Sequence, residues 1–295
     1  MRKAFLYPVA AIACGEVGFF LRRWELKSAF ESDTGLPIQG APAFWALVAL
    51  SFAAAALFFL LSRGEKQPLE GGYDQAFAAK GNTLYVSVMA LSALLLLAAG
   101  GLAFLNLPEA YSTAQVQTTL GGPNPMLSVL PKLLLAGLSV GSFFCVLALG
   151  RNSYRGEGKG KYSLPLLLPG YLAAFWLITA YQSRAGDPIR QDYIYEVCAI
   201  IAVLLAAYFI AGFSFERGKP GRTVFFSLLA VYLCLVTLAD GHDLAAMLLF
   251  GAFVLYFTAA VAVLLFNGDG RMRRSSAKEE PRETEIDTEE TTDEG

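Results

Sequence analysis

Six ionisable side chains lie inside or directly beside long apolar stretches of this 295-residue sequence. They are Glu16, Lys132, Glu196, Asp240, His242 and Asp243. A charged group in hydrocarbon is costly unless it is paired or hydrated, so each of these residues is a candidate for binding chemistry. The sequence predicts that all six lie toward the outer face of a membrane, where they would line a polar pocket.

Glu16 and Lys132 lie at comparable depths from the same face, in two different apolar stretches. A hydrogen-bonded pair would offset the cost of burying either charge, so we expect Glu16 to face the bundle interior close to Lys132. The alternative is that these side chains extend to the membrane surface. For Glu196, Asp240 and Asp243, that surface position is the simpler interpretation.

The motifs of several enzyme classes are missing from the sequence. His242 is the single histidine, which excludes a haem held by two histidines of one chain. Zinc-peptidase, nucleophile-elbow and phosphate-loop motifs are also missing. The segment 240–243 could hold a metal only with ligands from elsewhere, and a polar surface turn is the alternative. We therefore assign no catalytic residue, metal or cofactor, and an enzyme is the least favoured class.

Eight apolar stretches are long enough to cross about 30 Å of hydrocarbon as helices. They cover residues 4–21, 43–61, 83–105, 127–149, 164–181, 193–215, 223–239 and 244–266. The chain is 55% hydrophobic and 16% charged, which is typical of membrane proteins rather than soluble domains. Lipid offers no partners for unpaired backbone groups, so we predict an all-α integral membrane protein with eight transmembrane helices.

Basic residues predict the orientation of these helices. Of the 23 lysines and arginines, seventeen fall in segments on one side of the membrane and five on the other, while Lys132 lies within a stretch. The positive-inside rule then places both termini in the cytoplasm. Arg22, Arg23 and Lys27 conflict with this orientation, because they fall on the outer side. The sequence shows no basic groove with interleaved aromatics, which argues against nucleic acid as a partner.

A resemblance between two segments predicts an internal duplication. Residues 81–87 align with residues 221–227, four helices apart. We expect residues 1–150 and 151–266 to form two four-helix units in the same orientation, related by an axis along the membrane normal. The alternative is chance similarity between apolar segments. Prolines and glycines in the segment 106–126 predict a loop there. The charged composition of 267–295 predicts a disordered cytoplasmic tail.

The region after the first stretch resembles a known group of proteins. The segments Leu21-Arg22-Arg23-Trp24-Glu25-Leu26 and Thr34-Gly35-Leu36-Pro37 carry the resemblance, together with Phe30-Glu31. They resemble uncharacterised multi-pass membrane proteins of gut Firmicutes, a group without an assigned activity. The resemblance implies a bacterial cytoplasmic membrane and nothing about mechanism.

Two functions remain open from the sequence. The leading hypothesis is transport or binding of a small solute at the outward-facing polar pocket. The alternative is a membrane subunit, sensor or scaffold of a larger assembly without transport activity. A small-residue face at Gly137 and Gly141 offers a contact surface for such a membrane-protein partner.

Overall fold

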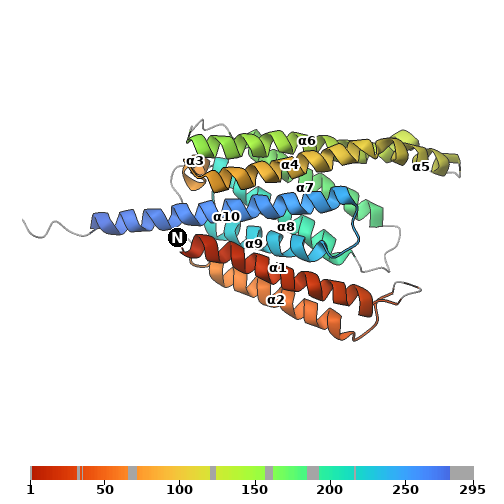
Figure 1. The fold of residues 1–295 in the computed structure, drawn as a ribbon, viewed down its shortest axis with the longest axis horizontal. Helices are drawn as coiled ribbons and strands as arrows, with labels where there is room; N and C mark the ends of the chain where they lie inside the picture. Colours follow the sequence, from red (N-terminus) through yellow and green to blue (C-terminus); the bar gives the residue numbers. More distant parts are fainter. Residues whose placement is uncertain are drawn as a thin grey trace, which may run out of the picture.

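The computed structural model describes residues 2–31, 34, 36–65, 72–119, 124–156, 162–184, 193–215 and 217–279. Within these residues the chain is helical, apart from one isolated β-bridge between Phe30 and Pro37 (Figure 1). Among the described residues, eight helices are long and apolar enough to cross a membrane, which confirms that part of the predicted fold class.

The membrane-length helices match the predicted stretches closely. They are α1 (Arg2–Ser28), α2 (Pro42–Ser62), α4 (Thr83–Leu105), α6 (Pro125–Arg155), α7 (Ser163–Arg184), α8 (Ile194–Ala211), α9 (Pro220–Thr237) and α10 (Leu244–Glu279). The shorter elements are α3 (Gly72–Ala76), α5 (Leu107–Thr119) and the 3-10 helix η1 (Gly212–Phe215).

Local signals in the sequence set several helix ends. Asn82 and Asn124 each accept a backbone N–H with the side-chain oxygen and so begin α4 and α6. Pro42 and Pro125 occupy the first turns of α2 and α6, where proline loses no hydrogen bond. At the end of α6, Gly156 adopts a positive φ of 68°, which costs glycine little.

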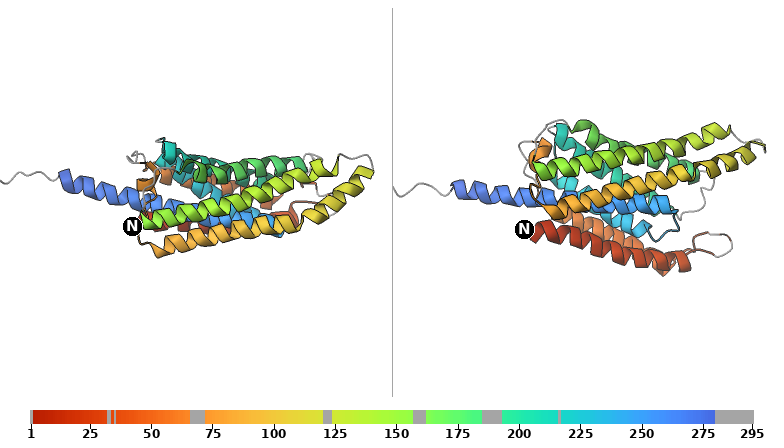
Figure 2. Two further views of the ribbon diagram at one scale, coloured as in Figure 1. Left: turned by 90° about the horizontal axis from the view of Figure 1, so that it is seen from above. Right: turned by 45° about the horizontal axis from the view of Figure 1, so that its top comes forward.

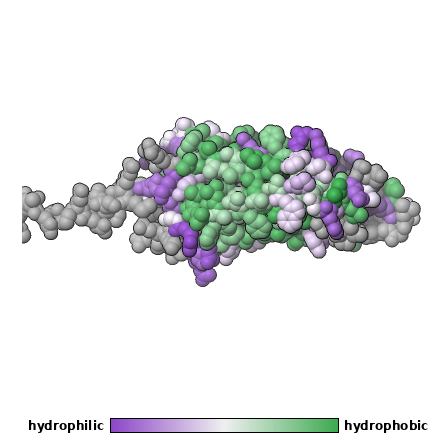
Figure 3. All heavy atoms as spheres, turned by 90° about the horizontal axis from the view of Figure 1, so that it is seen from below, coloured by the Kyte–Doolittle hydropathy of each residue, from purple (hydrophilic) through white to green (hydrophobic). Residues whose placement is uncertain are grey.

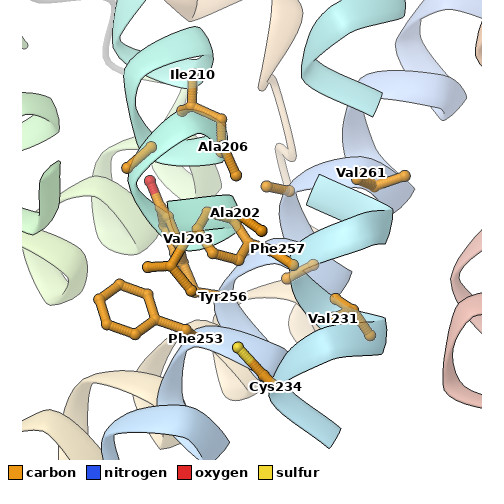
Figure 4. Close-up of a cluster of buried hydrophobic side chains, with 14 of the residues drawn as sticks. Ala202, Val203, Ala206, Ile210, Val231, Cys234, Phe253, Tyr256, Phe257 and Val261 are labelled. Atoms are coloured by element: carbon orange, nitrogen blue, oxygen red, sulfur yellow. The ribbon is translucent and has the colours of Figure 1, made fainter. Parts of the chain in front are cut away.

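The helices form three groups along one bundle axis. Helices α8, α9 and α10 lie in the middle, with α1 and α2 on one side and α4, α6 and α7 on the other (Figures 1 and 2). Side chains from α8, α9 and α10 fill the centre, including Val203, Val231, Phe253, Tyr256 and Phe257 (Figure 4). The N-terminus and the end of α10 lie at one end of the bundle, opposite α5 (Figure 1). We call these the N-terminal end and the α5 end.

On the face of the bundle that Figure 3 shows, an apolar band lies between two ends where hydrophilic side chains gather. Phe5, Phe52, Leu84 and Leu105 have 74–76% of their surface exposed. Water-soluble proteins rarely expose large patches of such side chains, whereas a lipid environment accommodates them. Apolar side chains therefore occur both in the core of the bundle and on its outer surface.

The predicted duplication is not confirmed. In the second half of the chain, α9 packs along both α8 and α10. In the first half α4 packs along α6, but α2 makes no comparable contact with α4 and instead packs against α1 and α9. Helices α4 and α9 therefore occupy different places, although residues 81–87 and 221–227 look alike.

Two predicted irregular segments contain helix. The loop predicted over 106–126 is wrong for residues 107–119, which form α5. Pro108 lies in the first turn, where it is tolerated, and no glycine or proline follows within the helix. The disordered tail was predicted from Asn267, but α10 continues to Glu279, because its first proline comes only at Pro281. Residues 280–295 lie outside the described residues.

Candidate functional site

A cleft of about 920 Å³ lies at the α5 end of the bundle. Its walls come from α4, α5, α6 and α7, from Glu196 of α8 and from the start of α10 with the turn before it. The floor is formed by Gly100, Ala136 and Ser139, where α4 and α6 are in close contact. The main polar side chains of the walls are Asn106, Gln117, Lys132, Glu196, His242 and Asp243.

A second hollow of about 410 Å³ follows α5 and α6 away from the cleft. Glu109 and Thr113 line this hollow, and it shares Gln117 and Lys132 with the cleft. Lys132 is exposed and stands where the two spaces meet. The side chain is therefore placed to contact an anionic group in either space.

Four of the six predicted pocket residues surround the cleft. Lys132 lies on α6, Glu196 on α8, and His242 and Asp243 in the α9–α10 turn. Glu196 is buried despite its charge, and Asp243 accepts a hydrogen bond from the Ala246 backbone at the start of α10. Both signs of charge thus occur in one cleft.

The prediction that Glu16 faces the interior near Lys132 is wrong. Glu16 is exposed near the middle of α1, and no ion pair or hydrogen bond joins it to Lys132 in the described part of the chain. The reason is the close contact of α1 with α9. A Cβ at Gly15 would lie 2.6 Å from Leu235, and one at Gly18 2.6 Å from Val236. This glycine face turns inward, so Glu16 projects outward.

The sixth predicted residue, Asp240, belongs to a buried ion cluster rather than to the cleft. The Arg22 side chain is 1% exposed and that of Glu25 2%. Arg22 donates from Nη1 to Glu25 Oε2 at 2.7 Å and from Nε to Asp240 Oδ1 at 2.6 Å. The guanidinium carbon also lies 5.0 Å from the centre of the Tyr195 ring. Charge-assisted bonds of this kind lock α1 to the α9–α10 turn.

The sequence did not predict the ion cluster, because the positive-inside rule accounts for Arg22 only as an outer-side residue in conflict with the orientation. A spacing signal was nevertheless present. Ala11, Gly15, Gly18, Arg22 and Glu25 follow one another at intervals of four and three residues, which places them on one helix face. Since Gly15 and Gly18 face α9 and Ala11 is buried, Arg22 and Glu25 on the same face had to lie inside as well.

Asp240 connects the ion cluster to the wall of the cleft. Thr237 donates its hydroxyl hydrogen to Asp240 Oδ2 at 2.9 Å. The same hydroxyl oxygen lies 3.0 Å from His242 Nε2. The hydrogen-bonded chain therefore runs from Glu25 through Arg22, Asp240 and Thr237 to His242.

The 240–243 segment does not gather its side chains around a common point. Asp240 turns to Arg22, His242 turns to Thr237, and Asp243 caps α10. Among the described residues, no group of three or more histidine, cysteine, aspartate or glutamate side chains could hold a metal ion. The chemistry of this site is hydrogen bonding and charge.

Comparison with protein-family models, curated proteins and solved structures found no match to this chain.

Proposed function

We propose that this protein is a multi-pass protein of a bacterial cytoplasmic membrane that binds a small polar solute in the cleft at the α5 end. In this proposal the eight long helices cross the bilayer, and both termini lie in the cytoplasm. The apolar band between two polar ends supports insertion, and the bias of basic residues toward the N-terminal end supports the orientation.

The cleft is the observation that carries the proposal. It has the volume of a small-molecule site, and its main polar side chains converge from three helices, the α4–α5 junction and one turn. Trp24, Trp45 and Tyr181, all exposed, lie near the ends of their helices at this end of the bundle. Exposed aromatic rings of this kind mark a membrane–water interface, and in the orientation proposed above this interface is the outer one.

The floor of the cleft supports binding rather than an open channel. Ser139 donates to the Leu96 carbonyl, and Gly100 lies against Ala136 and Val140. Beyond this contact the interface of α4 and α6 contains buried apolar residues such as Leu96 and Val146. A solute in the cleft would thus be held at one side of the membrane.

Ligand-induced stabilisation of the purified full chain tests this function. A panel of cationic, anionic and zwitterionic small solutes is added in detergent, and thermal unfolding is followed. A solute present at a hundred times its Kd should stabilise the protein by about 2.7 kcal/mol. Lys132→Met or Glu196→Gln should reduce this stabilisation. Glu16→Gln, which lies outside the cleft, should leave it unchanged. A panel that never stabilises the protein would contradict solute binding.

A second candidate function, a subunit of a membrane assembly, is favoured by the position of Glu16. A carboxylate exposed near the middle of α1 would contact lipid, which is costly. A partner helix that donates a hydrogen bond would remove this cost. The Gly137–Gly141 face supports this candidate less than expected, because a Cβ at Gly141 would already lie 2.9 Å from Leu168 of α7.

Native mass spectrometry in mild detergent distinguishes the two candidates. If α1 docks a partner helix, the complex should be present with Glu16 and lost in Glu16→Leu, while the control Val17→Leu keeps it. If the wild type and Glu16→Leu are both monomeric, the subunit function is excluded, and the solute-binding proposal is not affected.

A further inference from the structure

The hydrogen-bonded chain that ends at His242 fixes the position of a proton. A threonine hydroxyl has one hydrogen, and Thr237 gives it to Asp240 Oδ2. Toward His242 the Thr237 oxygen can therefore only accept. The imidazole must supply the hydrogen of the 3.0 Å contact, so Nε2 carries it.

Arg22 determines the direction of this chain from the other end. Its Nε donates to Asp240 Oδ1 at 2.6 Å, which requires Asp240 to act as an acceptor. With one oxygen bound to Arg22, the other oxygen receives the Thr237 hydroxyl. His242 Nε2 lies 3.8 Å from this second oxygen, too far for a direct hydrogen bond, so Thr237 is the necessary link.

The other ring nitrogen of His242 has no hydrogen-bond partner among the described residues. The side chain is only 5% exposed, and what remains open belongs to the cleft wall. Phe250 packs beside the ring, with 5.2 Å between the ring centres. Nδ1 keeps some accessible surface, so a ligand in the cleft that donates a hydrogen bond would give this acceptor a partner.

We propose that His242, held as the Nε2–H tautomer by Arg22, Asp240 and Thr237, presents Nδ1 to the cleft as the acceptor for a protonated amine. This inference rests on the proposed solute-binding function and names its ligand class. Two carboxylates of the cleft, Glu196 and Asp243, favour the same positive group. Lys132, on α6, complements an anionic end such as the carboxylate of an amino acid.

A primary amine could come from a soluble solute or from a lipid headgroup. Both would offer the same N–H donor to Nδ1, and the cleft opens where headgroups lie in the proposed orientation. The test therefore keeps the two sources in separate samples. Phosphatidylcholine has no N–H donor and provides the lipid background.

The first measurement reads the tautomer without any ligand. Because His242 is the single histidine, ¹⁵N-histidine labelling of the full chain in phosphatidylcholine nanodiscs gives one pair of ring nitrogens. At a pH where the ring is neutral, the wild type should show Nε2–H and an unprotonated Nδ1. Thr237→Val should give a mixture of tautomers. Thr223→Val, a buried threonine on the same helix, should leave the wild-type pattern. An Nδ1–H tautomer in the wild type, or no change in Thr237→Val, overturns the inference.

The second measurement adds methylammonium, glycine or acetate to the same sample and follows Nδ1. Methylammonium and glycine should shift the Nδ1 signal, and acetate should not. A shift with acetate alone overturns the amine class but leaves a solute-binding cleft. No shift with any of the three overturns this inference, while the stabilisation experiment with the wider panel decides the proposed function separately. A shift produced instead by replacing phosphatidylcholine with phosphatidylethanolamine supports the amine class and assigns the lipid as its source.

Discussion

The side chain on which the α5 end depends most is Arg22. Its guanidinium is buried, yet two carboxylates from different parts of the chain, Glu25 and Asp240, accept its hydrogen bonds. Removing one member of such a cluster leaves an uncompensated charge where water cannot reach it. Arg22 also holds Asp240 in place for Thr237, so the stability of this end and the geometry of the cleft depend on the same residue.

Loss of the Arg22 side chain should therefore lower the free energy of unfolding substantially. Arg22→Met should destabilise the protein by about 3–5 kcal/mol, the range for breaking a buried ion pair. The matched control is Lys3→Met, because the Lys3 side chain is 41% exposed where it meets Glu65 at 3.2 Å. A pair exposed in this way is worth about 0–1 kcal/mol. Urea or thermal unfolding in detergent measures both variants, and equal losses would show that the Arg22 cluster contributes little.

Residue types alone predicted part of the site. Lys132, Glu196, His242 and Asp243 were chosen because charges near apolar stretches are costly, and they do share a cleft. The same reasoning failed for Glu16, because depth along a helix says nothing about which face is buried. The inward face of α1 depends on how closely Gly15 and Gly18 approach α9, which is a property of two helices together.

At the scale of helices, close approach between α4 and α6 shapes the floor of the cleft. A Cβ at Gly100 would lie 2.8 Å from the Val140 side chain, 3.0 Å from the Ala136 carbonyl oxygen and 3.2 Å from the Val140 backbone nitrogen. Backbone atoms cannot move aside as a flexible side chain can. The neighbouring Gly101 has nothing within 4 Å of the same position.

These two glycines make a matched pair of substitutions on α4. Gly100→Ala should destabilise the protein by about 1–3 kcal/mol through overpacking of the α4–α6 contact. Gly101→Ala should stabilise it by about 0.5–1 kcal/mol, because alanine is the better helix former. Thermal unfolding of the two variants side by side gives the difference. Gly100→Ala as stable as Gly101→Ala would mean that α4 and α6 do not meet at this point.

Helix positions were predictable because hydropathy and length nearly suffice to find them. The stretch 83–105 coincides with α4, and 127–149 lies within α6. Which helices pack together was harder to predict, because an apolar helix face can contact either another helix or lipid. For this reason the similarity of 81–87 to 221–227 did not lead to equivalent places for α4 and α9. Sequence reasoning missed α5 because its composition is polar and Pro108 lies in its first turn, where proline does not interrupt a helix.

At the scale of the whole molecule, two different polar ends border one apolar band. The α5 end holds the cleft and the Arg22 cluster, whereas the N-terminal end holds α3, η1 and the continuation of α10 (Figure 1). The two ends therefore differ, and in the proposed membrane orientation the α5 end lies outside the cell.

Single cysteines test this orientation in a background without the natural cysteines. Ser112 on α5 and Lys80 before α4 are both exposed and lie at opposite ends of the bundle. A membrane-impermeant maleimide added to intact cells should label Ser112→Cys. Lys80→Cys should be labelled only after the cells are permeabilised. The reverse pattern would show the opposite membrane orientation. Labelling of both cysteines from outside would argue against a membrane-spanning bundle.

The most direct test of the account places a cysteine in the cleft itself. Ser128 on α6 is half-buried and lines both the cleft and the neighbouring hollow. In the same cysteine-free background, Ser128→Cys in intact cells is treated with a small, charged, membrane-impermeant methanethiosulfonate, with and without the solute that stabilises the purified protein. The account predicts that the cysteine reacts from outside and that the solute slows this reaction, while the rate at Ser112→Cys stays the same. A cysteine at 128 that reacts only after permeabilisation, or at a rate no solute changes, would contradict an outward-facing binding site.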